Sequence, residues 1–239
     1  MRFWKSSGMY QMRVICRFVM LNCLLILLSA PAHSQVNGSA VHAVTYVDVL
    51  PESVNGALAA LKQYRETSRT QAGYSSITLL EQLDRAGRLA IIEKWQSNAA
   101  FEEHLGNATY ANLQDKLRLL RTGSYDQRPY HSLLMDVELS RVSGTAVLIL
   151  THVDIAGGAQ GMDTLLQQYA AESRSVPGNV YCNVLQGNTR SNHFTLVAVW
   201  KDNASYMRNM AANYTRSFRN QLEPKTGSPL DERLYRIID

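Results

Sequence analysis

The chain has 239 residues and contains two copies of one pattern, spaced about 105 residues apart. The copies keep a common register from an opening strand-like segment to a closing one. The matching segments are Tyr46-Val47-Asp48-Val49 with His152-Val153-Asp154-Ile155, Leu61-Lys62-Gln63-Tyr64 with Leu166-Gln167-Gln168-Tyr169, Trp95-Gln96-Ser97-Asn98-Ala99 with Trp200-Lys201-Asp202-Asn203-Ala204, and Arg128-Pro129-Tyr130 with Arg233-Leu234-Tyr235. Because there are only two units and each is the size of a small domain, the pattern indicates a duplicated domain, not a solenoid.

Each copy changes its hydrophobic period in the same order. Residues 43–50 alternate as a strand does, and Pro51 opens a segment with helical spacing that runs until Gly73. Residues 74–83 and 88–95 are two strands joined by a hairpin turn, Ser97 or Asn98 caps a second helix, and residues 130–139 form a closing strand. The order β-α-β-β-α-β predicts an α+β fold of two tandem ferredoxin-like repeats, at residues 43–139 and 145–239.

The predicted strands are apolar on both faces. Ile91 and Ile92 are neighbours in one strand, and Leu196 and Val197 are neighbours in its counterpart. Helices cover only one face of a ferredoxin-like sheet, so the other face must be buried as well. We therefore expect the two repeats to pack sheet against sheet as a pseudo-dimeric α/β barrel with the helices outside. Association of such a pseudo-dimer with further copies is left open.

Residues 1–34 are predicted to be a secretory signal. Basic residues up to Arg17 precede an apolar run over residues 18–28, which is far shorter than the ~20 residues that span a bilayer as a helix. Small residues follow, and cleavage after Ala32 or after Ser34 fits them equally well. An uncleaved anchor is the alternative, and Met12 is a second possible start. We expect a secreted or periplasmic product with no stable membrane anchor after cleavage.

The net positive charge of the chain comes from this leader. The whole chain has 24 Lys and Arg against 20 Asp and Glu, a formal charge of +4. Four of the basic residues lie in the leader, which has no acidic residue, so the remainder is neutral and gives no electrostatic case for nucleic acid. Cys182 is the one cysteine beyond the leader. An intrachain disulfide and a cysteine metal cluster are therefore excluded for the mature chain.

Late in the first repeat, the segment Glu93-x-Trp95-x-Ser97-x-x-Ala100-Phe101-x-x-His104 resembles the antibiotic biosynthesis monooxygenase family of dimeric α/β barrels. In that family a strand ending in Glu-x-Trp leads into a helix that carries Ala, an apolar residue and His. Most members pair two identical chains, and this chain looks like both halves fused. Members of known activity oxidise aromatic quinols or anthrone-like polyketides with dioxygen and without metal, flavin or nicotinamide, whereas other members degrade haem.

The resemblance implies a site in the first repeat. Repeat 2 has Ala198 and Asn209 where repeat 1 has Glu93 and His104, and only the tryptophan persists. The position of the haem-ligating histidine is Gln114, which disfavours haem. Quinone-forming members carry an asparagine where this chain has Ile91, a departure from the pattern for quinol oxidation.

We expect His104 and Glu93 to be the catalytic groups. His104 is the candidate base or substrate anchor, and its alternative is a helix-surface or capping residue packed on Trp95. Glu93, if unpaired, would have a raised pKa on an apolar strand face, and its alternative is a salt bridge to Arg65, Arg69 or another basic residue.

Trp95, Tyr46 and Tyr74 are the candidate substrate-binding residues. Trp95 also fits simple core packing, as expected for a tryptophan repeated in both copies. His152 replaces Tyr46 in the second repeat, but no second ligand at metal spacing accompanies it, and no metal is expected. Motifs for nucleotides, for metalloproteases and for serine hydrolases are absent.

Two functions remain open. The first is an exported, cofactor-independent monooxygenase that oxidises a small phenolic, quinol or polyketide-like aromatic with dioxygen. The second is a non-catalytic barrel that binds a small hydrophobic or aromatic ligand. Loss of the motif in repeat 2 favours the second, and retention of Glu93, Trp95 and His104 together favours the first.

Overall fold

The computed structural model describes residues 40–134, 142, 144–157 and 160–238. The predicted leader, residues 1–34, lies outside this part of the chain. The elements of the first repeat are β1 (Val41–Asp48), η1 (Pro51–Ser53), α1 (Val54–Ser68), β2 (Tyr74–Gln82), β3 (Arg88–Trp95), α2 (Asn98–Leu105), α3 (Ala108–Arg118) and β4 (Asp126–Ser132). Those of the second are β5 (Val147–Asp154), α4 (Met162–Arg174), β6 (Asn179–Gly187), β7 (His193–Trp200), α5 (Asn203–Ala211), α6 (Asn213–Leu222), η2 (Glu223–Lys225) and β8 (Asp231–Ile238).

The predicted order of elements is confirmed, with differences at the boundaries. The first helix ends at Ser68, before Gly73, and a short 3-10 turn containing Pro51 precedes it. The second helix is two helices, because Asn107 caps a new one directly after α2. The closing strand begins at Asp126 and ends at Ser132, earlier than the predicted residues 130–139, the last of which are not described.

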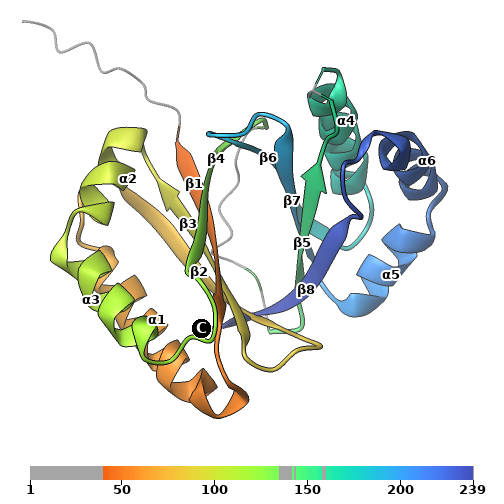
Figure 1. Ribbon diagram of the computed structural model, residues 1–239. Coiled ribbons are helices and arrows are strands. Elements are labelled where there is room, and N and C mark those ends of the chain that lie inside the picture. The colour runs from red at the N-terminus through yellow and green to blue at the C-terminus, as the bar shows by residue number, and fades with distance from the viewer. Residues whose placement is uncertain (1–39, 135–141, 143, 158–159, 239) are drawn as a thin grey trace, which may run out of the picture. The chain divides into compact units, whose positions relative to one another are not determined.

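The eight strands close into one barrel in the order β1-β3-β2-β8-β5-β7-β6-β4. Two antiparallel pairs join the repeats. In one, Leu79 to Gln82 of β2 face Ile238 to Tyr235 of β8, and in the other Tyr130 of β4 faces Gly187 of β6. The expected barrel is thus present, and its repeats share strand edges as well as an interior. In Figure 1, α1 to α3 cover one half of the barrel and α4 to α6 cover the other.

The strands are apolar on both faces because one core fills the barrel interior and a further core lies under the helices of each repeat. Ile92 belongs to the barrel interior, whereas its neighbour Ile91 packs under the helices of the first repeat. Val197 and Leu196 divide in the same way in the second repeat. Since successive side chains of a strand point to opposite faces, a barrel with helices outside needs apolar residues at nearly every strand position.

Short capped helices place the residues that follow β3. Ser97 is the N-cap of α2 and accepts a hydrogen bond from the Ala100 backbone N–H, and Asn107 does the same for Tyr110 in α3. This pair of caps holds α2 against the end of β3, so His104 in its last turn lies over the sheet. Within the described residues, none of the helices has both the length and the apolar character that crossing a membrane requires.

Candidate functional site

A carboxyl group lies buried between the sheet and the helices of the first repeat. Glu93 is on β3, where two-residue alternation places its side chain on the same face as Ile91 and Trp95. Its exposed fraction is 0%. Burying an ionised carboxylate costs free energy unless it is hydrogen-bonded, so the hydrogen-bonding partners of Glu93 determine its protonation state.

Three side chains from three elements surround Glu93. The Tyr64 hydroxyl, from α1, is hydrogen-bonded both to Glu93 Oε1 and to His104 Nε2, the latter at 2.5 Å. Gln127 of β4 donates from Nε2 to Glu93 Oε2 at 3.0 Å. His104 Nε2 itself is 3.9 Å from Glu93 Oε1, which makes an ion pair only when the histidine is protonated. Tyr64 therefore links the acid to the imidazole.

Amide side chains extend this chain at both ends. His104 Nδ1 is 2.7 Å from Gln71 Oε1, and Asn107 Nδ2 donates to the same oxygen at 2.9 Å. On the other side, the Tyr110 hydroxyl donates to Gln127 Oε1 at 3.1 Å. Asn107 is at the same time the N-cap of α3. A continuous hydrogen-bonded path therefore runs from a helix cap, through the imidazole and the carboxyl, to the closing strand.

Burial brings the two ionisable groups toward their neutral forms. It raises the pKa of Glu93 to about 7, against the lowering effect of hydrogen bonds from Tyr64 and Gln127. It lowers the pKa of His104 to about 4. Burial, followed by the nearby Glu93 charge, also raises the pKa of Tyr64. Between about pH 4 and pH 7, Glu93 and His104 are accordingly mostly neutral.

A salt bridge of Glu93 to Arg65 or Arg69 does not match the geometry, whereas His104 does pack on Trp95, although it is buried and not on the helix surface. Arg65 pairs with Glu66 and with the backbone oxygen of Ile238, and Arg69 pairs with Glu66, so neither arginine neutralises Glu93. His104 has an exposed fraction of 1% and faces the sheet, not solvent.

Aromatic rings form one side of the cluster. The Trp95 and His104 rings are stacked, with centroids 4.2 Å apart and an interplanar angle of 26°. Tyr74 meets Trp95 edge to face at 5.9 Å. The structure thus brings four of the five predicted site residues together: Glu93, Trp95, His104 and Tyr74.

Tyr46 is in a different place. It points into the barrel interior, where its hydroxyl is hydrogen-bonded to Nε2 of His152. His152 Nδ1 is in turn 2.9 Å from the Thr195 hydroxyl. Arg128 and Arg233 lie over the Tyr46 ring at 5.3 and 4.9 Å from its centroid. Tyr46 and Glu93 are on opposite sides of the sheet, so they cannot contact the same small substrate.

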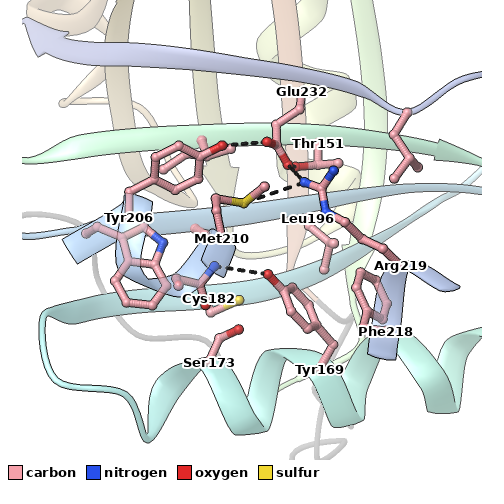
Figure 2. Close-up of a pocket in the computed structure, with 15 residues that line it drawn as sticks. Thr151, Tyr169, Ser173, Cys182, Leu196, Tyr206, Met210, Phe218, Arg219 and Glu232 are labelled. Atoms are coloured by element: carbon pink, nitrogen blue, oxygen red, sulfur yellow. Dashed lines mark hydrogen bonds and ion pairs between the residues drawn. The ribbon is translucent and has the colours of Figure 1, made fainter. Parts of the chain in front are cut away.

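The corresponding space in the second repeat holds a small cavity of about 20 Å³, room for about one water molecule. Ala198 and Asn209 replace Glu93 and His104 there, and their smaller side chains leave the space open. Aromatic residues form much of its wall, and these are Tyr169, Trp200, Tyr206 and Phe218. Figure 2 shows Tyr206 and Arg219 both reaching Glu232, the Arg219 pair at 2.8 Å.

A larger, polar cavity of about 460 Å³ lies between strands of the two repeats. Its charged lining is paired in part: Arg128 with Asp126, and His193 with Asp154. It contains none of the predicted site residues. No cluster of three metal-ligating side chains occurs among the residues described.

The comparison with known families agrees with this arrangement. The sequence profile of one family, described as antibiotic biosynthesis monooxygenase, matches residues 40–116 and 155–221, one segment in each repeat. The chain belongs to the antibiotic biosynthesis monooxygenase family. A search of curated proteins found no match.

Solved structures show the same tandem architecture. A candidate monooxygenase from Fusobacterium nucleatum superposes with a TM-score of 0.73 at 12% identity, covering 84% of this chain and 94% of its own. A candidate monooxygenase from Lactobacillus acidophilus gives 0.67 at 10% identity, covering 83% and 94%. An anthrone oxidase-like protein gives 0.68 at 12% identity, covering 84% and 92%. At these identities the likeness establishes the fold.

Several members of the cluster escaped the sequence analysis. Gln71 and Asn107 lie in a loop and at a cap, where amides are common for local reasons. Gln127 did carry a signal, because it and its counterpart Glu232 stand directly before the repeated Arg128 and Arg233. In this monooxygenase family chain, the motif residues Glu93 and His104 therefore belong to a wider hydrogen-bonded set, and Trp95 stacks on His104.

Proposed function

We propose that the protein is a cofactor-independent monooxygenase that oxidises a small phenolic, quinol-like or anthrone-like aromatic compound with dioxygen in the first repeat. The observation that carries the proposal is the hydrogen-bonded chain from Glu93 through Tyr64 to His104, beside the Trp95 ring. Phenol oxidation without a cofactor needs a proton acceptor, an aromatic wall and exclusion of water, and this buried chain supplies all three.

His104 is the terminal proton acceptor in this proposal. The substrate hydroxyl gives its proton to the Glu93 carboxyl, Glu93 passes a proton to the Tyr64 oxygen, and Tyr64 passes one to His104 Nε2. The substrate loses one proton and His104 gains one. Because burial makes His104 a weak base, it returns the proton readily to a later, more basic intermediate.

The oxygen chemistry balances without a further reductant. The phenolate passes one electron to dioxygen, and the resulting superoxide combines with the substrate radical at a ring carbon that bears hydrogen. The peroxide so formed takes the proton back from His104. Loss of water, which includes the remaining hydrogen of that carbon, leaves a carbonyl group. One oxygen atom enters the product, the other leaves as water, and the substrate supplies every electron.

Two features suit this site to an aromatic hydroxyl compound. Gln127, the partner of Glu93 Oε2, is only half-buried, so the carboxyl lies one side chain away from the surface. The Trp95 Nε1–H is buried and has no hydrogen-bond partner among the described residues, which makes it a donor for a substrate oxygen. A substrate that displaces Gln127 would meet the acid, the indole and the Tyr74 ring.

A second candidate function is binding without catalysis, as the second repeat's cavity suggests. Its aromatic wall and the Arg219–Glu232 pair match a small polar aromatic ligand, and a ligand of that size enters only when the surrounding side chains move apart, because the space of about 20 Å³ holds about one water molecule. It lacks the carboxyl and imidazole of the first repeat, so it offers no comparable proton path. The two functions are compatible, because the two proposed sites belong to different repeats.

Oxygen consumption tests the proposal. Purified protein is mixed under air with hydroquinones and anthrone-like compounds. We expect uptake by the wild type, its loss in His104→Ala, and its retention in Asn209→Ala, the same change at the equivalent position of repeat 2. Absence of uptake, with quenching of tryptophan fluorescence by the same compounds, would leave only the binding function. Loss in Asn209→Ala alone would move the reaction to the second repeat.

We further propose that residues 1–34 direct export and are then removed. Support comes from the short apolar run and the small residues after it. The mature protein should be found outside the cytoplasm with an N-terminus following Ala32 or Ser34. An intact N-terminus at Met1 or Met12 in the cytosolic fraction would contradict this.

A further inference from the structure

We propose that Asn107 and Gln71 are positioning residues that hold His104 as its Nδ1-protonated tautomer and thereby keep a proton on Glu93 in the resting protein. The assignment of protons follows from the hydrogen-bonding groups together with the burial of His104, which favours its neutral form. Its role in the reaction rests on the proposed function, but the protonation state itself does not.

One end of the hydrogen-bonded chain is a backbone N–H, a group that can only donate. The backbone N–H of Tyr110 lies 3.1 Å from Asn107 Oδ1 at the N-terminus of α3, so that terminal atom of Asn107 must be the oxygen. The other terminal atom is then the amide nitrogen, which donates to Gln71 at 2.9 Å. The atom of Gln71 that receives it must be Oε1.

The same Gln71 oxygen determines the histidine tautomer. It lies 2.7 Å from His104 Nδ1, and since a carbonyl oxygen cannot donate, Nδ1 carries the hydrogen. Gln71 Nε2 is buried and has no hydrogen-bond partner among the residues that the structure describes. This orphaned donor indicates that Asn107 and His104 together impose the orientation of the amide, because Gln71 gains nothing from it at its other atom.

The proton on Glu93 follows from Tyr64. A neutral His104 with hydrogen on Nδ1 has a lone pair on Nε2, which accepts the Tyr64 hydroxyl proton at 2.5 Å. A tyrosine has one hydroxyl proton, and it goes to Glu93 Oε1 when Glu93 is ionised. When a neutral His104 accepts that proton instead, the contact between the Tyr64 oxygen and Glu93 Oε1 needs a proton on Glu93. Oε2 accepts from Gln127, which leaves Oε1 as the protonated oxygen.

The electrostatic surroundings agree. Tyr64, His104 and Gln127 contact Glu93 directly, and Tyr110 and Tyr125 are close enough to feel its charge. Arg121, which lies over the Tyr125 ring at 5.9 Å, is the cation whose charge reaches Tyr110 and Tyr125. Independently, desolvation raises the pKa of Glu93 and lowers that of His104. Both shifts favour the protonated acid beside the neutral imidazole.

One nearly isosteric substitution should reverse the direction of the hydrogen bonds from Gln71 through His104 and Tyr64 to Glu93. Asn107→Asp keeps an oxygen for the Tyr110 N–H but replaces the donor toward Gln71 with a second oxygen. Gln71 must then turn its NH₂ group toward Asp and His104, so Nδ1 becomes an acceptor and Nε2–H donates to Tyr64. Tyr64 in turn donates to Glu93, which is stabilised as a carboxylate. If His104 instead takes a second proton because the new carboxylate at position 107 is nearby, Nε2–H still donates to Tyr64, and Tyr64 still donates to an ionised Glu93.

Spectroscopy of the full protein without substrate tests this at pH 6. We expect an infrared band of a protonated carboxyl that Glu93→Gln abolishes, and a ¹⁵N signal of His104, assigned with His104→Gln, typical of the Nδ1–H tautomer. Asn107→Asp should lose the carboxyl band and the Nδ1–H signature. Asn98→Asp, which adds the same charge at an exposed position of α2, should keep both.

The proposal is overturned if wild-type His104 is the Nε2–H tautomer, if Glu93→Gln leaves the carboxyl region unchanged, or if Asn107→Asp behaves like Asn98→Asp. These readouts need no turnover. Expected spectra in a protein that consumes no oxygen would therefore refute the proposed function and leave the tautomer assignment standing. In an active enzyme, Asn107→Asp should in addition shift the pH profile of oxygen uptake to lower pH, which loss of packing alone would not do.

Discussion

Tyr46 and His152 are equivalent residues of the two repeats, and they are hydrogen-bonded to each other inside the barrel. Equivalent residues can touch only near the axis that relates the repeats. With a tyrosine on both sides, two identical groups would meet there. The change to histidine in the second repeat pairs a phenol with an imidazole, and burial lowers the pKa of His152 to about 4, which keeps it neutral.

Tyr46→Phe should destabilise the fold without affecting oxidation. The change leaves the buried His152 Nε2 without a partner, at a cost of about 1–3 kcal/mol in the free energy of unfolding. Urea denaturation measures this loss. Since Tyr46 lies on the other side of the sheet from Glu93, the KM for an oxidised substrate should stay at the wild-type value. A raised KM would restore Tyr46 to the substrate site predicted from the sequence.

Glu93 and His104 should make opposite contributions to the dependence of stability on pH. The folded pKa of Glu93 is about 7, above the ordinary value of 4.5, so its contribution to stability is full below pH 4.5 and is lost as pH rises to 7. The folded pKa of His104 is about 4, below 6.5, so the unfolded chain binds more protons between these values and stability rises with pH. Between pH 4.5 and 6.5 the two slopes oppose each other.

Single substitutions should reveal how each group contributes to the dependence of stability on pH. Relative to the wild type, Glu93→Gln should gain stability as pH rises from 4.5 to 7, by on the order of 2–3 kcal/mol in total. His104→Gln should lose stability, relative to the wild type, as pH rises from 4 to 6.5. Urea unfolding at several pH values gives both curves. A difference from the wild type that does not vary with pH would show that neither group has a shifted pKa.

Tyr64→Phe should interrupt the proton path while keeping the packing of α1. Without the hydroxyl, Glu93 and His104 no longer share a hydrogen-bonded partner, and proton-transfer catalysis typically contributes about 10²–10⁴-fold to a rate. We expect at least a tenfold fall in kcat for oxygen uptake. Tyr169→Phe, at the same position of repeat 2, is the matched control and should retain the wild-type rate. Equal losses in the two variants would indicate a general packing effect.

Gly73→Ala should destabilise the protein more than Gly144→Ala. Gly73 has φ of 74°, and an added Cβ would collide with the Ala100 side chain. Gly144 has nothing within 4 Å of the same position. A backbone in the left-handed region costs a residue with a side chain about 1–2 kcal/mol, before the collision is counted. A thermal melt that ranks the two variants in the reverse order would contradict this account of the turn before β2.

Sequence patterns predicted more of the fold than of the site. Alternation in residues 88–95 placed Glu93 and Trp95 on one face, and the structure confirms that face as the buried one under the helices. Helical spacing could not show that the second helix restarts at Asn107. Spacing does not reveal where the backbone leaves the helix, and only at such a point does a side chain act as an N-cap. The edge pairing of β2 with β8 and of β4 with β6 was also beyond local patterns, since it joins residues far apart in the chain.

Local periodicity and matching segments are enough to specify the duplication, the order of elements, the strands with two apolar faces and the motif residues Glu93, Trp95 and His104. Which groups are hydrogen-bonded to one another depends on tertiary contacts. Gln71, Asn107 and Gln127 come from separate loops and strands, and their amides acquire a definite direction only when neighbouring donors and acceptors are in place. The tertiary structure also separates Tyr46 from Glu93, because side chains on opposite faces of a sheet meet different cores.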